Sequence, residues 1–183
     1  MKGETMLLDS NSKEYVNKLR DLNLDARDGL DEDLFLLVSS LVPIANVDML
    51  VTNESGQILL SYRDDEFYGE SWHIPGGCMR YGETFEHRLV ETSKKELGCI
   101  VEYDTEPLAV RNVLRGPNAQ LEHPDERGHN VAILFNCRLP NGFTISNGGK
   151  KQFENGYLKW FDKLPDTFLK IQYVFRDRLE RWM

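Results

Sequence analysis

The stretch WHIPGGCMRYGETFEHRLVETSKKELGC, residues 72–99, decides most of what the chain reveals about its fold. It begins with a Pro-Gly-Gly turn, continues through a short loop and ends with a closing glycine, Gly98. Between the loop and that glycine, residues 84–97 carry apolar side chains at helical spacing. The stretch therefore predicts a turn, a loop and one amphipathic helix in sequence.

One carboxylate of this helix, Glu96, falls on the apolar side. Phe85, Leu89 and Glu96 are four and then seven residues apart, so they project within a narrow sector. An ionised carboxylate taken out of water is costly unless it pairs with a cation or coordinates a metal. Two outcomes are open: Glu96 reaches solvent at a frayed last turn, or it binds a metal. The glycine pair Gly76 and Gly77 favours the metal, because glycines let backbone groups approach a ligand closely, and Mg²⁺ accepts one carboxylate plus a backbone carbonyl.

Composition and charge narrow the class of protein. The 183 residues carry a formal net charge of −8, which argues against nucleic acid as a partner, because such binding needs clustered Lys and Arg. No apolar run reaches the roughly 18 residues needed to span a membrane, and the first residues lack the pattern of a signal peptide. Three cysteines at irregular spacing indicate reduced thiols. We expect a cytoplasmic protein with no membrane partner.

The elements along the chain predict a mixed α/β fold in a single domain, residues 1–183. A weak helix is expected within 11–27, in a helical extension of about residues 1–30, and a short helix at 31–41. Strands are expected at 44–51, 57–63, 106–115, 129–139 and 156–161.

Two connections follow from this pattern. The turn TNESG, residues 52–56, predicts a hairpin between the strands on either side of it. The last 16 residues place Phe168, Ile171, Phe175, Leu179 and Trp182 at spacings of three and four. This spacing predicts one amphipathic helix that covers the sheet.

The opening stretch resembles the Nudix box, G-x5-E-x7-R-E-U-x-E-E-x-G-U, in which U is a bulky aliphatic residue. Gly77, Glu83, Glu96 and Gly98 match it, so the resemblance places the box at 77–99. The departures are Glu91 at the Arg, Thr92 at the next Glu, Ser93 at the U, Lys95 at the first Glu of the pair and Cys99 at the closing U. The resemblance implies a Nudix-type α/β/α sandwich with a mixed sheet. It leaves open whether Arg88 or Arg80 holds Glu83 in place of the missing Arg.

The surroundings of the box are similar to one Nudix branch, the GDP-mannose mannosyl hydrolases, which also keep only the last Glu of the pair. In that branch water attacks the anomeric carbon of the sugar, and the nucleoside diphosphate leaves intact. The resemblance covers roughly residues 33–163. It implies a hydrolase of a GDP-mannose-like nucleotide sugar that uses Mg²⁺, with Mn²⁺ as the alternative, and a homodimer.

The resemblance assigns three further residues. Asp48 matches a strand aspartate of the branch and is expected to be catalytic. Arg63 matches a diphosphate-binding arginine, and His129 matches a histidine that opens a strand and is expected to contact the substrate. The residues themselves also allow other roles. Asp48 could be a solvated strand residue, Arg63 could pair with its acidic neighbours at 64–66, and His129 could lie at the edge of the core.

Two functional positions of the branch are changed. Asn155 stands at the histidine base, and Cys78 at a second diphosphate arginine, for which Arg80 could substitute. Because Asn does not accept a proton usefully near neutral pH, the base is expected to be Glu154, or His123 of the loop 116–128. The implied metal ligands are Gly76 or Gly77, Glu96 and Glu154.

Three functions stay open from the sequence. The first is a hydrolase of a nucleoside diphosphate sugar, acting at the sugar carbon or at the pyrophosphate. The second is a pyrophosphohydrolase of another nucleoside diphosphate derivative, which would release a nucleoside monophosphate. The third is a Nudix-shaped nucleotide-binding protein with little turnover, for which the lost box carboxylates argue.

Overall fold

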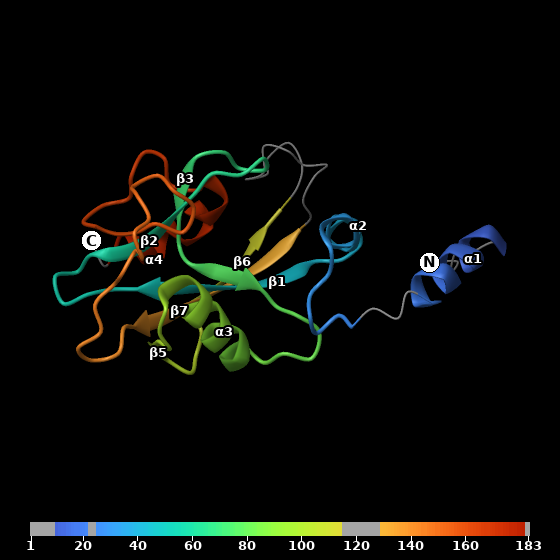
Figure 1. Ribbon diagram of the computed structural model, residues 1–183, viewed down its shortest axis with the longest axis horizontal. Helices are drawn as coiled ribbons and strands as arrows, with labels where there is room; N and C mark the ends of the chain where they lie inside the picture. The colour runs from blue at the N-terminus through green and yellow to red at the C-terminus, as the bar shows by residue number, and fades with distance from the viewer. Residues whose placement is uncertain (1–9, 22–24, 115–128, 182–183) are drawn as a thin grey trace.

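Two β-sheets and the helices around them make up the fold in the computed structural model, which describes residues 10–21, 25–114 and 129–181 (Figure 1). The elements are α1 Ser10–Asp21, α2 Glu32–Leu41, β1 Ile44–Val51, β2 Ile58–Arg63, β3 Ser71–His73, β4 Gly76–Cys78, α3 Phe85–Leu97, β5 Glu102–Tyr103, β6 Ala109–Val113, β7 Asn130–Arg138, β8 Leu158–Phe161, the 3₁₀ helix η1 Lys170–Phe175 and α4 Arg176–Leu179.

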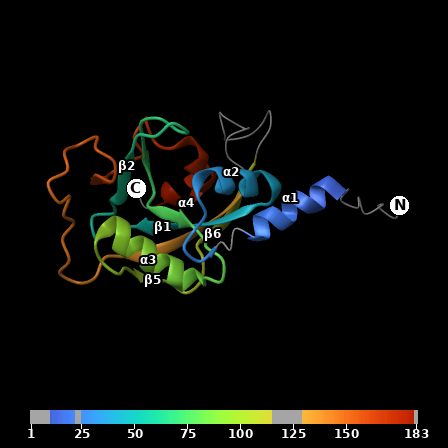
Figure 2. The same cartoon turned by 45° about the vertical axis from the view of Figure 1, so that its right-hand side comes forward.

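The larger sheet has mixed strand directions, as predicted. Strand β1 runs parallel to β7 and antiparallel to β4, while β5 and β6 both pair antiparallel with β7. Helix α3 packs against β1 and β4, and η1 packs against β6. Figures 1 and 2 show α3 on one side of this sheet and the C-terminal helices on the other. The predicted α/β sandwich is confirmed.

The smaller sheet has the strand order β3-β2-β8, and it contradicts the predicted hairpin. Beyond the turn, β1 and β2 share only the bridge between Thr52 and Ile58. The strands then separate because each has a longer partner elsewhere: β1 pairs with β7 over eight positions, and β2 pairs with β8 over four. The turn depends on neighbouring residues, whereas the choice of partner strand depends on residues far along the chain.

Each side of the larger sheet has its own hydrophobic core. Alternation along β1 sends Val47, Met49 and Val51 into the core beneath α3, whereas Leu50 joins the core with Phe175 of the C-terminal segment. Residues 46 and 48 therefore face the second side, away from α3. This alternation matches the sequence pattern.

Helix α3 begins and ends close to the predicted positions. The Thr84 side chain accepts a hydrogen bond from the His87 N–H at 3.2 Å, which caps the first turn. Gly98 ends the helix with φ = +76°, a left-handed conformation that costs glycine little. The distance from Thr84 to Gly98 within the box is thus the distance between the two caps of α3.

The C-terminal segment buries three of the five predicted residues and is not the predicted single helix. Phe168, Phe175 and Leu179 are buried, Ile171 is partly buried, and Trp182 lies outside the described residues. The segment is a 3₁₀ helix followed by one short turn of α-helix. The Trp72 N–H donates to the Thr167 carbonyl, and the Leu169 N–H donates to the Trp72 carbonyl. These bonds to β3 keep 167–169 extended, so the helix begins only at Lys170.

The N-terminal helices lie outside this core. Asp31 caps α2 by accepting from the Leu34 N–H at 2.9 Å, as its acidic start predicts. Helix α1 stands apart from the remaining elements in both views (Figures 1 and 2), as expected for an extension. In the described ranges of the chain, no helix has the length and apolar character needed to cross a membrane.

Candidate functional site

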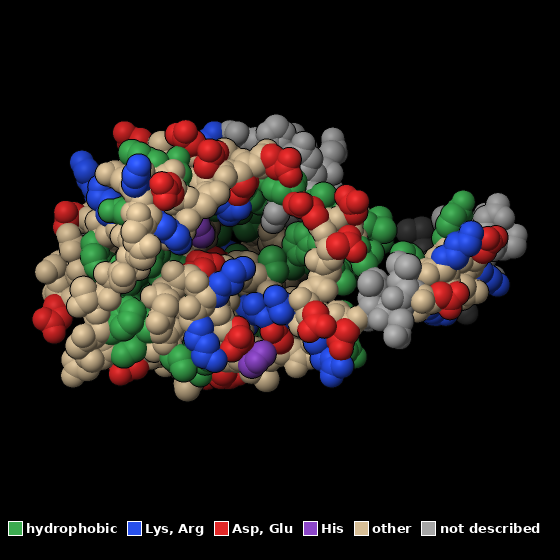
Figure 3. All heavy atoms as spheres, viewed as in Figure 1, with side chains coloured by type: hydrophobic (Ala, Val, Ile, Leu, Met, Phe, Trp, Pro, Cys, Tyr) green, Lys and Arg blue, Asp and Glu red, His purple; other side chains and the backbone are tan. Residues whose placement is uncertain are grey.

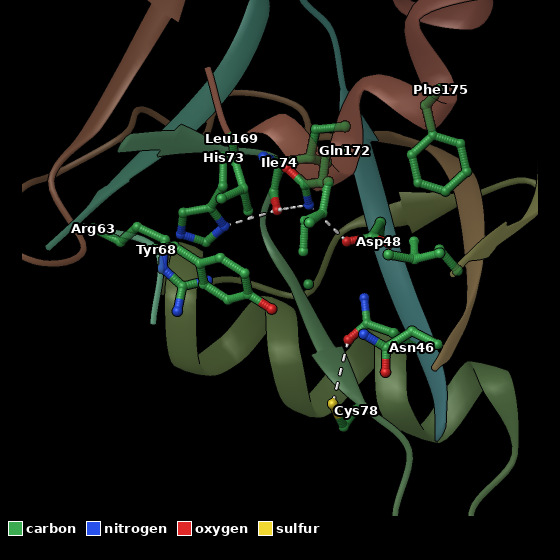
Figure 4. A pocket seen from close by; sticks show the side chains of 15 residues that line it. Asn46, Asp48, Arg63, Tyr68, His73, Ile74, Cys78, Leu169, Gln172 and Phe175 are labelled. Carbon is green, nitrogen blue, oxygen red and sulfur yellow. Dashed lines mark hydrogen bonds between the residues drawn. The ribbon is translucent and has the colours of Figure 1, made fainter. Parts of the chain in front are cut away.

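A pocket of about 100 Å³ opens between the two sheets and the C-terminal segment. Asp48 and Gly76 of the larger sheet line it on one side, and Arg63 and His73 of the smaller sheet line it on the other (Figure 4). The face seen in Figure 3 is hollowed near its middle, with acidic and basic side chains around the hollow. The pocket thus brings together groups of both charges from distant parts of the chain.

Asp48 is buried in this pocket rather than solvated, with an exposed fraction of 2%. Its Oδ1 accepts from Nε2 of Gln172 at 2.9 Å, and Gln172 also bonds both backbone groups of Ile74. Burial raises the pKa of the Asp48 carboxyl to about 7, although the hydrogen bonds from Asn46 and Gln172 oppose that rise. A nearby cation would stabilise the ionised form of a carboxyl group that is buried in this way.

Gln172 was not identified from the sequence, although a signal was present. It lies four residues after Phe168 and three before Phe175, so it falls on the apolar line of the C-terminal segment. A polar residue on such a line was the observation that singled out Glu96. The same reasoning applied to Gln172 would have marked it as a buried hydrogen-bonding residue.

Glu96 and Asp48 approach Gly76 from different directions. Gly76 pairs with Asp48 in the β1–β4 ladder, and its N–H lies close enough to the Glu96 carboxylate to lower the pKa of Glu96. A Cβ atom at residue 76 would lie 2.6 Å from Asp48 Oδ1 and 2.8 Å from the Val47 carbonyl oxygen. Only glycine fits between these groups, and its backbone is therefore exposed to both carboxyl groups.

The environment of Glu96 fits a metal ligand. Its Oε2 atom is buried without a hydrogen-bond partner, which is costly for a carboxylate. Burial raises the pKa of Glu96 to about 7, and the nearby Asp48 adds to the rise, while Lys95, the Gly76 N–H and Arg63 oppose it. The buried Asp48 carboxyl, the half-buried Glu96 with its buried Oε2, and glycine carbonyls are the oxygen donors that Mg²⁺ prefers. Among the described residues, no three His, Cys, Asp or Glu side chains form a metal cluster.

Arg88, and not Arg80, holds the first box glutamate. Arg88 Nε donates to Glu83 Oε2 at 2.8 Å, and a second bond joins its Nη2 to Oε1. Burial alone would raise the pKa of Glu83, but the Arg88 pair and the Arg80 N–H hold it below its usual range. Arg88 stands one turn before Glu91, the box position of the missing Arg. The anchor of Glu83 has therefore moved along the same helix face.

Arg63 pairs with an acidic neighbour, one of the two roles that the sequence left open, and its diphosphate contact stays a prediction. Its guanidinium bonds Asp65 through Nε at 2.6 Å and through Nη2, and its charge lies 4.9 Å from the centre of the Tyr68 ring. It also lines the pocket, and Figure 4 shows it on the side opposite Asp48 and Asn46. Asp65 further accepts from the N–H groups of Phe67 and Tyr68. Pairing with Asp65 thus orients Arg63 within the pocket wall.

His73 is a pocket residue that the sequence reasoning missed. Its Nδ1 lies 3.0 Å from the Ile74 carbonyl oxygen. Burial lowers the pKa of His73 to about 4, and the Arg63 charge adds to this effect, so the ring is neutral at pH 7. With Nδ1–H donating to Ile74, Nε2 is a hydrogen-bond acceptor. A histidine directly before the turn carried no periodicity signal that set it apart from an ordinary strand residue.

Asn155, at the histidine base of the resembling branch, holds the backbone next to Arg63. Its Oδ1 accepts from the Asp64 N–H at 2.5 Å, and its Nδ2 donates to the Asp64 carbonyl at 3.1 Å. Both ends of the amide are therefore used. This residue positions the end of β2 from a distant loop.

The remaining predicted residues that the structure describes, Glu154, Arg80 and His129, are not among those that line this pocket. Glu154 is exposed in the turn next to Asn155. The Arg80 Nη1 donates to the Arg27 carbonyl at 3.3 Å, so its side chain extends toward the N-terminal segment. His129 lies two residues before Val131, which packs against the core beneath α3. The Nε2 atom of His129 is buried without a hydrogen-bond partner. His123 lies outside the described residues.

Replacing Asn155 with Asp should weaken nucleotide binding about three- to tenfold and leave magnesium affinity unchanged. The carboxylate keeps an acceptor for the Asp64 N–H but loses the donor to its carbonyl, and one hydrogen bond is worth about 0.5–1.5 kcal/mol. Calorimetric titrations with a nucleoside diphosphate and with Mg²⁺ measure the two affinities.

A matched control is available in Asn147, which bonds both backbone groups of Leu158 in the same way, at 2.7 and 3.1 Å. Asn147→Asp should cost similar stability on urea unfolding without changing nucleotide affinity. Equal losses of nucleotide affinity in both variants would show that Asn155 has no specific link to the site.

Comparisons with known proteins identify the family of this chain. The NUDIX domain matches residues 42–163. The chain is 31% identical over 72 residues to the low-salt glycan biosynthesis protein Agl8 of Haloferax volcanii, a match that covers 39% of this chain and 46% of that protein, so it spans about half of that relative. It is 26% identical over 144 residues to the ADP-ribose pyrophosphatase of Methanocaldococcus jannaschii, covering 78% of this chain and 76% of that protein.

A solved structure shows the same fold. The MutT NUDIX hydrolase from Burkholderia pseudomallei superposes with a TM-score of 0.56 at 22% identity, covering 76% of this chain and 97% of that one. The family match extends from the residue before Pro43 to Lys163, and so includes the box, the pocket residues of both sheets and the Asn155 turn. The chain belongs to the NUDIX domain family.

Proposed function

We propose that this Nudix hydrolase cleaves a nucleoside diphosphate derivative, with a nucleotide sugar as its substrate class. The observation that supports this most directly is the set of groups around Gly76 and on the opposite pocket wall. Asp48 and Gly76 line the pocket, and Glu96 Oε2, buried and unpaired, lies next to Gly76, so these oxygens suit a divalent cation. Arg63 lines the facing wall of the same pocket and suits phosphate. A diphosphate bound to a cation has the charges to satisfy both.

The proposed metal site consists of Glu96, a carbonyl of Gly76 or Gly77, and Asp48, with Mg²⁺ as the expected ion and Mn²⁺ as the alternative. A bound divalent ion would polarise a phosphoryl oxygen and acidify water. The chain's own groups would then position the substrate. Arg63 offers a planar fork for two charge-assisted hydrogen bonds to phosphate oxygens, and Gln172 fixes the Asp48 carboxyl toward Gly76.

Attack at phosphorus is the favoured reaction. Both ends of the Asn155 amide are used to hold Asp64, which supports a site without a proton acceptor at that position. The likeness to an ADP-ribose pyrophosphatase over 144 residues supports the same reaction. Attack at the sugar carbon is the second candidate, favoured by the 31% identity to a glycan biosynthesis protein, because glycan synthesis consumes nucleotide-activated sugars.

The product of hydrolysis in ¹⁸O-labelled water distinguishes these reactions. Label in a nucleoside monophosphate or sugar phosphate is expected for attack at phosphorus. Label in the free sugar, with unlabelled nucleoside diphosphate, would instead establish attack at carbon. Saturable nucleotide binding without turnover under any divalent metal would leave the nucleotide-binding function and refute the hydrolase.

Glu154 is the proposed proton acceptor for the attacking water. Its carboxylate stands in the turn next to Asn155, at the end of the smaller sheet that carries Arg63. Glu154→Gln should lower kcat about 10²–10⁴-fold, the usual contribution of general base catalysis, with nucleotide affinity retained. His123→Ala should cost less. Steady-state kinetics and calorimetry on both variants provide the measurement, and full activity of Glu154→Gln would assign the base elsewhere.

The homodimer and the cytoplasmic location stay predictions from the sequence. Helix α2 exposes Leu37 and Leu41, with exposed fractions of 47% and 72%, and exposed apolar side chains are common at interfaces between copies. Analytical ultracentrifugation of the chain and of a Leu41→Glu variant tests whether this helix contributes to association.

A further inference from the structure

A second pocket, of about 290 Å³, adjoins the first. It lies between residues 67–71, which lead into and begin β3, and residues 166–171, before and within η1. Tyr68, Leu169 and Ile171 line both pockets, so these three side chains form the wall between them. A ligand bound in the first pocket near Arg63 therefore has the second pocket directly beside it.

One residue that lines the second pocket, Ser71, carries a buried hydroxyl without a partner. Ser71 has an exposed fraction of 5%, it lines the pocket, and its Oγ makes no hydrogen bond. An unsatisfied buried hydroxyl costs roughly 1–3 kcal/mol. Such a group is well placed to bond a ligand, which would remove that cost on binding.

The strand register places this hydroxyl beside the proposed phosphate site. Ser71 is directly opposite Arg63 in the β2–β3 ladder, and directly opposed side chains in an antiparallel pair lie on one face with Cβ atoms about 4.5–5.5 Å apart. His73, two residues along β3, is on the same face and lines the first pocket. A group bound at Ser71 would therefore lie close to the phosphates that Arg63 binds in the proposed function.

The walls of the second pocket suit a flat apolar ring better than a sugar. Phe67, Phe168, Leu169 and Ile171 contribute aromatic and aliphatic surface, whereas a hexose needs hydrogen bonds around its whole edge. The volume lies at the lower end of ligand sites, which run from about 300 Å³ upward, and fits a ring system rather than a whole nucleotide. The rim carries the exposed carboxylate of Asp166, which can only accept hydrogen bonds.

We propose that the second pocket binds the nucleobase of the substrate and prefers bases with an exocyclic amino group. Ser71 bonds the edge of the ring, Phe67 and Tyr68 pack against its face, and Asp166 accepts from the amino group. Guanine, adenine and cytosine offer that donor, and uracil does not. This inference rests on the proposed function, because it places the base by its distance from Arg63 and the diphosphate.

Ser71→Ala tests this proposal, because it should weaken GDP binding without lowering the stability of the free protein. Removing an unsatisfied hydroxyl should leave the melting temperature of the free protein unchanged or raised. The affinity for GDP in the presence of Mg²⁺ should fall about three- to tenfold, the value of one hydrogen bond. Inorganic pyrophosphate, which has no base, should bind the variant and the parent equally. Calorimetric titration with both ligands gives the two affinities.

Ser71→Val extends the test by filling the pocket. It should weaken GDP binding further than Ser71→Ala while pyrophosphate binding is retained. Arg63→Ala is the comparator for the phosphate site and should weaken both ligands. Equal GDP affinity in Ser71→Ala, Ser71→Val and the parent would overturn the base site and leave the proposed function intact. Absence of binding for both ligands by the parent would overturn the proposed function and the base site with it.

Base preference is the second readout. The parent should bind GDP, ADP or CDP at least about threefold more tightly than UDP, since an amino group adds about one hydrogen bond. Asp166→Asn should reduce this ratio, and Glu54→Gln, which removes an exposed carboxylate from the turn after β1, should leave it unchanged. Equal affinities for all four nucleotides in the parent, or the same ratio in Asp166→Asn, would refute the role of Asp166 and the amino-base preference.

Discussion

Replacing Glu96 with Gln should lower turnover by about 10³-fold and weaken magnesium binding, with the fold retained. The reason is that a metal ion contributes several kcal/mol of charge stabilisation to the transition state, and each 1.36 kcal/mol is tenfold in rate. Gln keeps the shape of Glu96 and a carbonyl oxygen beside the Gly76 N–H, but it has no charge for the metal. Calorimetric titration with Mg²⁺ and steady-state kinetics measure the two effects.

The same helix provides the matched control. Glu91 is exposed and pairs with Lys94 at 2.9 Å, so Glu91→Gln removes an equal charge from α3 without touching the pocket and should change neither quantity. Because burial raises the pKa of Glu96 to about 7, protons compete with the metal, and magnesium affinity of the parent should fall as the pH is lowered from 8 to 6. Glu96→Gln should show a weaker pH dependence. Magnesium affinity equal to that of the parent would disprove the assignment of Glu96.

Replacing Arg88 with Met should lower the free energy of unfolding by about 3–5 kcal/mol. The side chains of Arg88 and Glu83 are 10% and 8% exposed, and removing one partner of a buried pair leaves a charge without compensation. Urea unfolding followed by circular dichroism measures the change. The box loop should also lose its shape, because Glu83 Oε2 accepts the Arg80 N–H at 2.8 Å.

Two comparisons separate this effect from a general loss of charge. The double variant Glu83→Met with Arg88→Met should recover much of the lost stability, because no uncompensated charge remains. Arg176→Met breaks the exposed pair with Glu180, whose partners are 62% and 50% exposed, and should cost at most about 1 kcal/mol. A cost for Arg88→Met no larger than that of Arg176→Met would contradict the anchoring role.

The departures from the Nudix box have physical counterparts in the fold. Thr92 and Ser93, at a Glu and an aliphatic position of the box, are both buried, and Ser93 Oγ bonds the Val90 carbonyl within its own helix. A Cβ at residue 77 would lie 3.0 Å from Thr92 Oγ1, so the short Thr side chain contacts the glycine turn directly. A carboxylate next to the Pro-Gly-Gly turn is instead supplied by Asp48, on the neighbouring strand β1.

Local sequence patterns predicted the parts of this fold that depend on local physics. The boundaries of α3 follow from an N-cap and a left-handed glycine, and the two faces of β1 follow from strict alternation. Glu96 could be identified because one carboxylate on an apolar helix face is unusual by itself. Each of these inferences needs only the neighbours of a residue along the chain.

The tertiary structure decided which distant segments meet. Strand β1 pairs with β7 across more than 80 residues of chain rather than with β2 beyond the adjacent turn, and bonds from 167–169 to Trp72 delay the last helix. Gln172 bonds Asp48 from a helix that begins only at Lys170. Asn155 bonds Asp64 from the loop before β8, which pairs with β2. Periodicity along the chain reports whether a side chain is buried, because burial repeats with the geometry of the element. The partner that a buried polar group finds depends on how the elements pack together, and the sequence of one element does not contain that information.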